Sequence, residues 1–231
     1  MERVKRVYGY LVRFKEAVIR VRCGTPDYSD LPDPKYDWAR TVYGEVVELI
    51  PPDIPKPLGK AVVHTCYVDA NLLHCLITGK SVTGVLHFWN QTPGEWYSKK
   101  QATVETATYG SEFVAARTAV DQIEDIRQTF RYLGVPIVGK SYLFGDNQSV
   151  VISGTVPQSA LKKRHSLLSY HRVREAVAST MLAFNHMPGE HNPADILSKH
   201  WGYQQVWKTL RLISFWDWTK EPDEDEEEPE D

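Results

Sequence analysis

The chain has 231 residues, of which 42% are hydrophobic and 25% charged, a length that suits one good-sized core with a smaller appended unit. No stretch approaches the roughly 18 consecutive apolar residues of a membrane span, and the charged N-terminus does not fit the apolar region of a signal peptide. We therefore expect an intracellular protein without a membrane partner. The three cysteines form no C-x-x-C pair, which argues against a disulfide framework and against a cysteine zinc site.

Charge and composition divide the chain into four segments. Residues 1–23 carry apolar residues at spacings of three and four between Arg and Lys, which predicts a basic amphipathic helix. Residues 24–60 are rich in Pro and Asp and predict a linker. Residues 61–213 form the expected main domain. Residues 214–231 are strongly acidic and predict a disordered tail, so that the body without the tail has an excess of basic residues.

Strands and helices alternate from residue 61 onward. Three β-rich runs, at 61–73, 81–89 and 95–98, predict antiparallel strands. Helical spacing of apolar residues predicts a long helix from about Phe113 to Leu133, which Gly134 and Pro136 end. The later elements are expected in the order strand (141–146), helix (147–154), helix (165–180), strand (181–188) and closing helix (192–213). This order predicts an α/β fold with a mixed five-stranded sheet flanked by helices, because strands that follow helices can return parallel.

Four carboxylates occupy positions that such a sheet would bring together. Asp69 lies inside the first strand, where an unpaired carboxylate is costly. Each of the others has an ordinary structural explanation: Glu112 and Asp195 could favour helix dipoles, with Asn192 as the N-cap before Asp195, and Asp146 could be an N-cap. Jointly, the four can converge at the carboxyl ends of the strands, where open α/β sheets bind ligands.

Such a group of carboxylates predicts a metal site. Four negative charges at one place repel one another unless cations neutralise them. Oxygen ligands without Cys or clustered His suit Mg²⁺ or Mn²⁺ rather than zinc. Two such ions about 3.5–4 Å apart support in-line displacement at a phosphodiester.

Ordered motifs over about residues 61–202 give the chain a family resemblance. They are YVDAN, SVTGVLHFWNQTPGEWYSKKQATVETATYGSEFVAARTA, FGDNQSVV, KKRHSLLSYHRVRE and HMPGEHNPADILSKHWG. In order and spacing they resemble the ribonuclease H domain of copia-type retrotransposon Pol polyproteins. The segment MERVKRVYGYL looks like the last helix of the reverse-transcriptase thumb that precedes this domain in the family. The chain is then expected to be a piece of a longer polyprotein or a decayed copy, two alternatives that stay open.

The resemblance implies a ribonuclease-H-like fold and a two-Mg²⁺ endonuclease that hydrolyses the RNA strand of RNA–DNA hybrids. The family's catalytic and metal-binding acids fall on Asp69, Glu112, Asp146 and Asp195. It implies one ion shared by Asp69 and Asp146 on the attacking side and steadied by Asp195, and another held by Glu112 and Asp69. Implied partners are the hybrid and the polymerase portion of a reverse transcriptase, in the cytoplasm within a virus-like particle or in the nucleus.

One family feature has no clear counterpart. Cellular ribonucleases H carry a histidine on a mobile loop before the last helix, and here that loop is the short PGEHN. Whether Glu190 or His191 takes this part is left open by the sequence.

Substrate-binding residues are expected around the acids. Amide and hydroxyl side chains at Asn71, Gln148 and Ser149 are candidates for reading the 2′-hydroxyl of RNA. Two basic clusters could hold phosphates without sequence preference, or could be solvated helix faces; they comprise Lys99, Lys100, Lys162, Lys163, Arg164, His165, Arg172 and Arg174.

Two other functions remain open from the sequence. The same fold could be a catalytically idle module that binds hybrid or a reverse-transcriptase partner, which would bind hybrid without cutting it. It could also be a nuclease or transposase that acts on DNA, because a fold does not fix a substrate.

Overall fold

The computed structural model describes residues 2–13, 15, 21–161, 164–201, 209 and 213. The chain divides into two compact units, one of residues 1–21 with 202–231 and one of residues 22–201. In the first, helix α1 (Glu2–Arg13) covers part of the predicted N-terminal helix. The predicted acidic tail lies outside the described residues. In the described part of the chain, no helix combines the length and the apolar character needed to cross a membrane.

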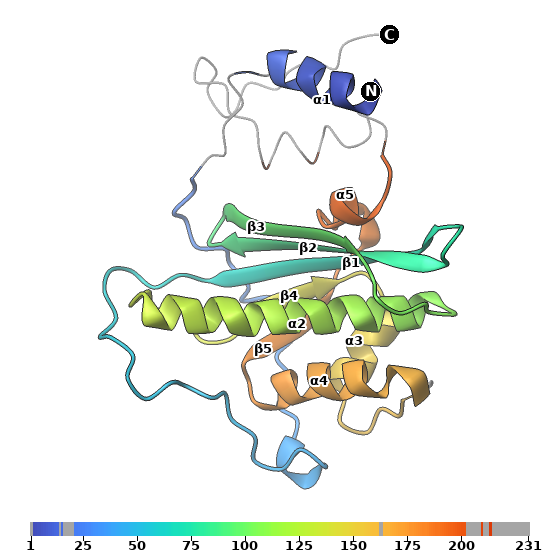
Figure 1. Cartoon of the computed structure of the whole chain (residues 1–231). Helices are drawn as coiled ribbons and strands as arrows, with labels where there is room; N and C mark the ends of the chain where they lie inside the picture. Colours follow the sequence, from blue (N-terminus) through green and yellow to red (C-terminus); the bar gives the residue numbers. More distant parts are fainter. Residues whose placement is uncertain are drawn as a thin grey trace. The chain divides into compact units, whose positions relative to one another are not determined.

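The second unit is built on one five-stranded mixed sheet (Figure 1). Its strands are β1 (His64–Cys75), β2 (Lys80–Trp89), β3 (Thr92–Lys100), β4 (Ser141–Gly145) and β5 (Leu182–His186). Their order across the sheet is β3-β2-β1-β4-β5. The pairs β1–β2 and β2–β3 are antiparallel, whereas β1–β4 and β4–β5 are parallel. The predicted α/β fold with a mixed five-stranded sheet is therefore confirmed.

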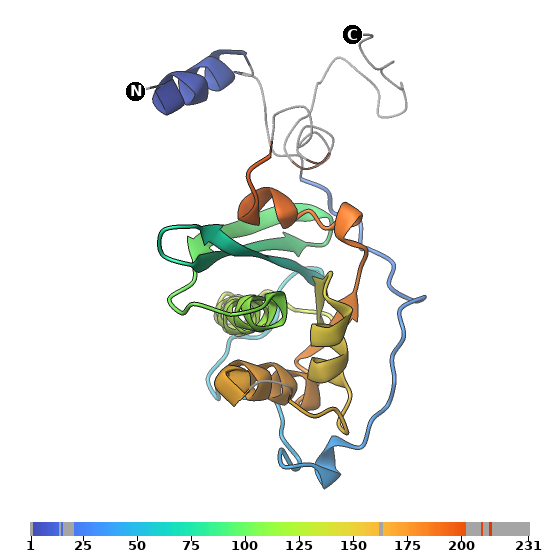
Figure 2. The same ribbon diagram turned by 90° about the vertical axis from the view of Figure 1, so that its right-hand side faces the viewer.

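Helices cover both faces of the sheet. Helices α2 (Thr108–Tyr132) and α4 (Leu167–Ala178) lie on one face, and the single turn α5 (Asp195–Ser198) lies on the opposite face of β1–β3 (Figure 2). Helix α3 (Gln148–Thr155) follows β4. The described residues of the unit also contain short 3₁₀ turns at Trp38–Arg40, Arg164–Ser166 and Gly189–His191.

The alternation of side chains along β1 explains this layering. Cys66, Val68 and Ala70 belong to the buried core with Phe113 and Val120 of α2. Because successive side chains of a strand point to opposite faces, the residues between them face away from α2. The long helix ends as predicted: Gly134 takes φ +70°, a conformation that favours glycine, and its N–H donates to the Arg131 carbonyl over 3.0 Å.

The prediction of one helix over residues 192–213 is wrong at its start. Ala194, not Asn192, is the N-cap of α5, and the backbone is already extended at Lys199 (φ −111°, ψ 157°). The buried Asn192 side chain instead donates to the Val68 carbonyl of β1 over 2.9 Å and accepts from the Ala194 N–H over 3.1 Å. This bond to the sheet holds the segment against β1. Most of the predicted helix beyond residue 201 lies outside the described residues.

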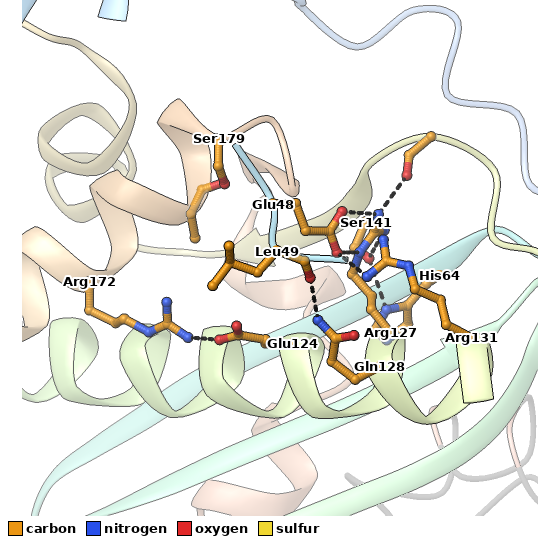
Figure 3. A network of polar contacts seen from close by, with 12 residues as sticks. Glu48, Leu49, His64, Glu124, Arg127, Gln128, Arg131, Ser141, Arg172 and Ser179 are labelled. Carbon is orange, nitrogen blue, oxygen red and sulfur yellow. Dashed lines mark hydrogen bonds and ion pairs between the residues drawn. The ribbon is translucent and has the colours of Figure 1, made fainter. Parts of the chain in front are cut away.

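The segment 24–60, predicted as a linker, packs against the sheet unit. Glu48 accepts from Arg127 Nε and Nη2 over 2.7 and 2.8 Å, and Arg131 Nη1 lies 2.8 Å from the same carboxylate (Figure 3). Gln128 donates to the Leu49 carbonyl over 2.7 Å. The compact unit consequently begins at Arg22, and the predicted boundaries at residues 61 and 213 stay predictions.

The same network continues into the interior of the protein. Arg127 Nη1 donates to Ser141 Oγ over 3.1 Å, and Ser141 Oγ lies 3.0 Å from His64 Nδ1 (Figure 3). His64 Nε2 lies 3.1 Å from Nδ1 of the buried His87. Burial lowers the pKa of both rings, that of His87 to about 4.

Candidate active site

Three carboxylates from three different elements meet at one end of the sheet. One oxygen each of Asp69, Glu112 and Asp146 lies within 4.8 Å of the others. Asp69 is 1% exposed, Glu112 is also buried, and Asp146 is partly exposed. Water can therefore reach the group from the Asp146 side.

The strand pairing explains why Asp69 and Asp146 are neighbours. β1 and β4 run parallel with Val68 opposite Gly145. Asp69, the next residue of β1, and Asp146, the residue directly after β4, therefore lie at the same level. Asp146 is not the cap of α3, because Asn147 has that role and its side chain accepts from the Val150 N–H. The Asp146 side chain therefore has no capping role and contributes its carboxylate to the cluster.

Glu112 reaches the cluster from the beginning of α2, which packs on β1. Its carboxylate is buried, and one of its oxygens lies within 4.8 Å of an oxygen of Asp69. The glutamate therefore lies beside the strand.

A glycine in β2 admits the fourth acid. Gly84 is the register partner of Asp69, and a Cβ built on it would lie 2.7 Å from the Ala194 carbonyl oxygen and 3.0 Å from the Ser198 nitrogen. The backbone of α5 can lie this close to β2 only because Gly84 has no side chain. Asp195 and Ser198 are thereby brought to Asp69.

Two residues that the sequence analysis did not single out bind Asp69 directly. Ser198 Oγ donates to Asp69 Oδ2. Lys199 Nζ lies 3.4 Å from Asp69 Oδ1 and 2.5 Å from Asp195 Oδ1. The spacing of Asp195 and Lys199, four residues apart, is the signal that could have pointed to this ion pair.

Burial and mutual repulsion set the electrostatics of the cluster. Burial, followed by the charges of Asp69 and Asp146, raises the pKa of Glu112 well above its usual value. Burial and the Asp69 charge also raise the pKa of Asp146. The pKa of Asp195 rises to about 6, chiefly through burial, although Lys199 opposes the shift. The ionised cluster is therefore under electrostatic strain that a cation would relieve.

The residues present fit a divalent cation. The cluster offers carboxylate oxygens alone, which is the donor set that Mg²⁺ and Mn²⁺ prefer. Burial, followed by repulsion from neighbouring carboxylates, raises the pKa of Glu112 and of Asp146, so ionising both groups without a cation is costly.

The amide and hydroxyl candidates for substrate binding lie near the acids. Asn71 follows Asp69 on β1, and its Nδ2 lies 3.1 Å from His74 Nδ1. Gln148 and Ser149 are exposed in the first turn of α3, directly after Asp146. Their positions suit contact with a ligand at the cluster, and their role stays a prediction.

The basic candidates differ in whether their charged groups already have partners within the protein. Lys99 and Lys100 end β3 and are exposed, as is Arg164, whereas Lys162 and Lys163 lie outside the described residues. Arg172 is bonded to Asp121 and Glu124, and His165 to Glu105. Arg174 is buried and donates to the carbonyls of Ser153, Val156 and Pro157, so it does not belong to a surface cluster.

The loop before α5 touches the acidic cluster through its glycine. A Cβ on Gly189 would lie 3.1 Å from Asp146 Oδ2. The exposed His191 lies 3.6 Å from its neighbour Glu190. A role for Glu190 or His191 at the site stays a prediction.

The strand order, the strand directions and the placing of the acids agree with the ribonuclease-H-like fold that the sequence analysis predicts. By sequence, residues of this chain are 28% identical over 134 residues to the Retrovirus-related Pol polyprotein from transposon TNT 1-94 of Nicotiana tabacum, a match that covers 58% of this chain and 10% of that polyprotein. No model of a known protein family matches the chain. The predicted resemblance to the ribonuclease H domain of a retrotransposon Pol polyprotein is thus confirmed.

Solved structures with a similar arrangement are ribonucleases H and a viral reverse transcriptase. The N-terminal RNase H domain of a Mycobacterium tuberculosis protein matches with a TM-score of 0.46 and 13% identity, over 65% of this chain and 98% of that chain. LC11-RNase H1 in complex with RNA/DNA hybrid matches with 0.46 and 15%, over 64% and 99%. The foamy viral protease-reverse transcriptase in complex with RNA/DNA hybrid matches with 0.41 and 15%, over 81% and 24%.

Proposed function

We propose that this chain is a metal-dependent endonuclease that hydrolyses the RNA strand of RNA–DNA hybrids and acts as part of a retrotransposon reverse transcriptase. The observation that carries the proposal is the meeting of Asp69, Glu112 and Asp146 within 4.8 Å at one end of the sheet. The similarity to a retrotransposon Pol polyprotein supports the choice of substrate.

The four acids divide into a cluster and an adjoining pair. Asp69, Glu112 and Asp146 would hold one Mg²⁺ or Mn²⁺, and Asp69 with Asp195 would complete the site for a second ion. This division replaces the one that the family resemblance implies, in which Glu112 and Asp146 serve different ions. Ions bound there supply positive charge that stabilises the attacking and leaving oxygens of an in-line displacement at phosphorus. The reaction adds water across the P–O3′ bond and leaves a 5′-phosphate and a 3′-hydroxyl.

The residues around the acids have positioning and binding roles in this proposal. Ser198 donates to Asp69 and fixes the orientation of its carboxylate. Asn71, Gln148 and Ser149 would contact the minor groove, where the 2′-hydroxyl distinguishes RNA from DNA. Exposed lysines such as Lys99 and Lys100 would bind phosphates and make the affinity dependent on salt.

An idle hybrid-binding module is the second candidate, and one observation favours it. The ammonium group of Lys199 already lies 3.4 Å from Asp69, so part of the acidic charge is neutralised by the protein itself. Such a module would bind hybrid and cut nothing.

The test offers the purified protein an RNA–DNA hybrid, double-stranded RNA and duplex DNA, each with Mg²⁺ or with chelator. The proposal predicts that the RNA strand of the hybrid alone is cut, that chelator stops the cutting and that Asp146→Asn abolishes it. Equal cutting of duplex DNA would overturn the substrate assignment. Hybrid binding without any cutting would establish the idle module instead.

A further inference from the structure

Lys199, the residue that directly follows helix α5, contacts two of the acids at once. Helix α5 ends at Ser198, and Lys199 itself is extended, yet its side chain turns back to Asp195 and Asp69 over 2.5 and 3.4 Å. Its side chain is 33% exposed, whereas that of Asp69 is 1% exposed. The ammonium group therefore lies at the border between solvent and the buried acid.

An ordinary surface ion pair would not account for these contacts. A pair between residues four apart on a helix contributes little when exposed. Here the lysine also reaches a carboxylate 130 residues away in sequence, on the central strand. Ser198 bonds the other oxygen of the same carboxylate. Both oxygens of Asp69 consequently have a partner from the end of α5.

The three-carboxylate cluster has a different environment. The Lys199 ion pairs within the described chain go to Asp69 and Asp195, whereas no ion pair of the described residues reaches Glu112 or Asp146. The acidic site thus has two parts that share Asp69, and the ammonium group pairs with both carboxylates of one part but with Asp69 alone in the other.

We propose that Lys199 acts as a built-in cation for the Asp69–Asp195 pair. The protein without substrate then binds one divalent ion, at Asp69, Glu112 and Asp146. A second ion binds only when Lys199 leaves the pair. The phosphate of a bound substrate would draw the ammonium group away, because it offers a competing negative charge. Lys199 is then a positioning residue that couples loading of the second ion to arrival of nucleic acid. This inference rests on the proposed function for the identity of the site.

Removing the ammonium group should have two effects in the absence of any substrate. The Asp69–Asp195 pair loses its neutralising partner, so the metal-free protein should melt at a lower temperature. The pair also becomes available to a divalent ion, and Mn²⁺ affinity should rise on the order of fivefold or more, because a unit positive charge near the site no longer repels the ion.

The experiment measures bound Mn²⁺ per chain by calorimetric titration and thermal melting in chelator. The variants are Lys199→Met, which keeps the length without the charge, and Lys199→Arg, which keeps the charge. Lys140→Met is a matched control, because Lys140 is 30% exposed and also pairs with one aspartate, Asp33, away from the acidic cluster.

We expect one bound ion for the parent, for Lys199→Arg and for Lys140→Met, and two bound ions with a lower metal-free melting temperature for Lys199→Met. Two ions on the parent, or an unchanged ion number and melting temperature in Lys199→Met, would overturn the inference. These readouts need no cleavage. A parent that binds one ion and cuts no hybrid would contradict the proposed function while leaving the role of Lys199 standing.

Discussion

Replacement of Gly84 by alanine tests how the site is assembled, because it adds one methyl group on the strand opposite Asp69. The new Cβ would lie 2.7 Å from the Ala194 carbonyl oxygen and 3.0 Å from both Leu197 Cβ and the Ser198 nitrogen. Two of these neighbours are backbone atoms, which cannot rotate away. Helix α5 must therefore move off the sheet, and Ser198 must move away from Asp69.

The size of the effect follows from this crowding. Overpacking of a well-packed site costs about 1–3 kcal/mol. For a unit of this size, each kcal/mol lowers the melting temperature by about 2–4 °C, so the variant should melt about 2–12 °C below the parent. Cleavage should fall more steeply than stability, because Asp195 moves together with α5.

The assay compares thermal melting and hybrid cleavage of Gly84→Ala with those of Gly24→Ala. The control glycine has φ outside the left-handed region, and a Cβ there would meet only the Gln91 side chain at 3.7 Å; a change within about 0.5 kcal/mol is expected for it. A Gly84→Ala protein that melts and cleaves like the parent would refute the close approach of α5 to β2.

Three further predictions concern the charged interior. Glu112→Gln should raise the melting temperature in chelator at pH 8 but have little effect near pH 4.5. A carboxyl group whose pKa is raised in the folded protein makes the protein less stable as the pH rises above the pKa of that group in the unfolded chain. A lower melting temperature of the variant at both pH values would contradict this. Stability should fall as the pH drops from about 6.5 towards 4, since unfolding lets His64 and His87 take up protons, and His87→Gln should reduce this slope in denaturant titrations. Glu48→Gln should cost about 3–5 kcal/mol in urea unfolding, because it leaves the Arg127 charge buried and unpaired; an unchanged midpoint would mean that the segment is a loose linker.

Local sequence patterns predicted the sheet and the convergence of the acids, whereas the catalytic roles of the acids come from the family resemblance and stay a prediction. An aspartate within a strand and a glutamate near the start of an apolar helix can each be recognised from the pattern of a few neighbouring residues. The parallel pairing of β1 and β4 then aligns Asp69 with Asp146. The structure brings both together with Glu112, and Asp195 joins through Asp69 and Lys199.

Contacts between distant segments could not be predicted in this way. Glu48 binds an arginine 79 residues away, and the Pro/Asp-rich composition around it is equally typical of a free linker. The end of α5 at Ser198 depends on the bond from Asn192 to β1, which no helical periodicity reveals. On a continuous helix Lys199 would be an ordinary surface partner of Asp195, and its contact with Asp69 on β1 spans 130 residues of sequence.

The most direct test of the central claim is the chemistry of the cut ends. The RNA strand of a hybrid is cut in ¹⁸O-labelled water with Mg²⁺, and the products are identified by mass spectrometry. The account predicts fragments with a 3′-hydroxyl and a 5′-phosphate that carries one solvent oxygen, and no products in chelator or with Asp146→Asn. Products that end in a 2′,3′-cyclic phosphate, or cutting that persists in chelator, would contradict hydrolysis at this carboxylate cluster.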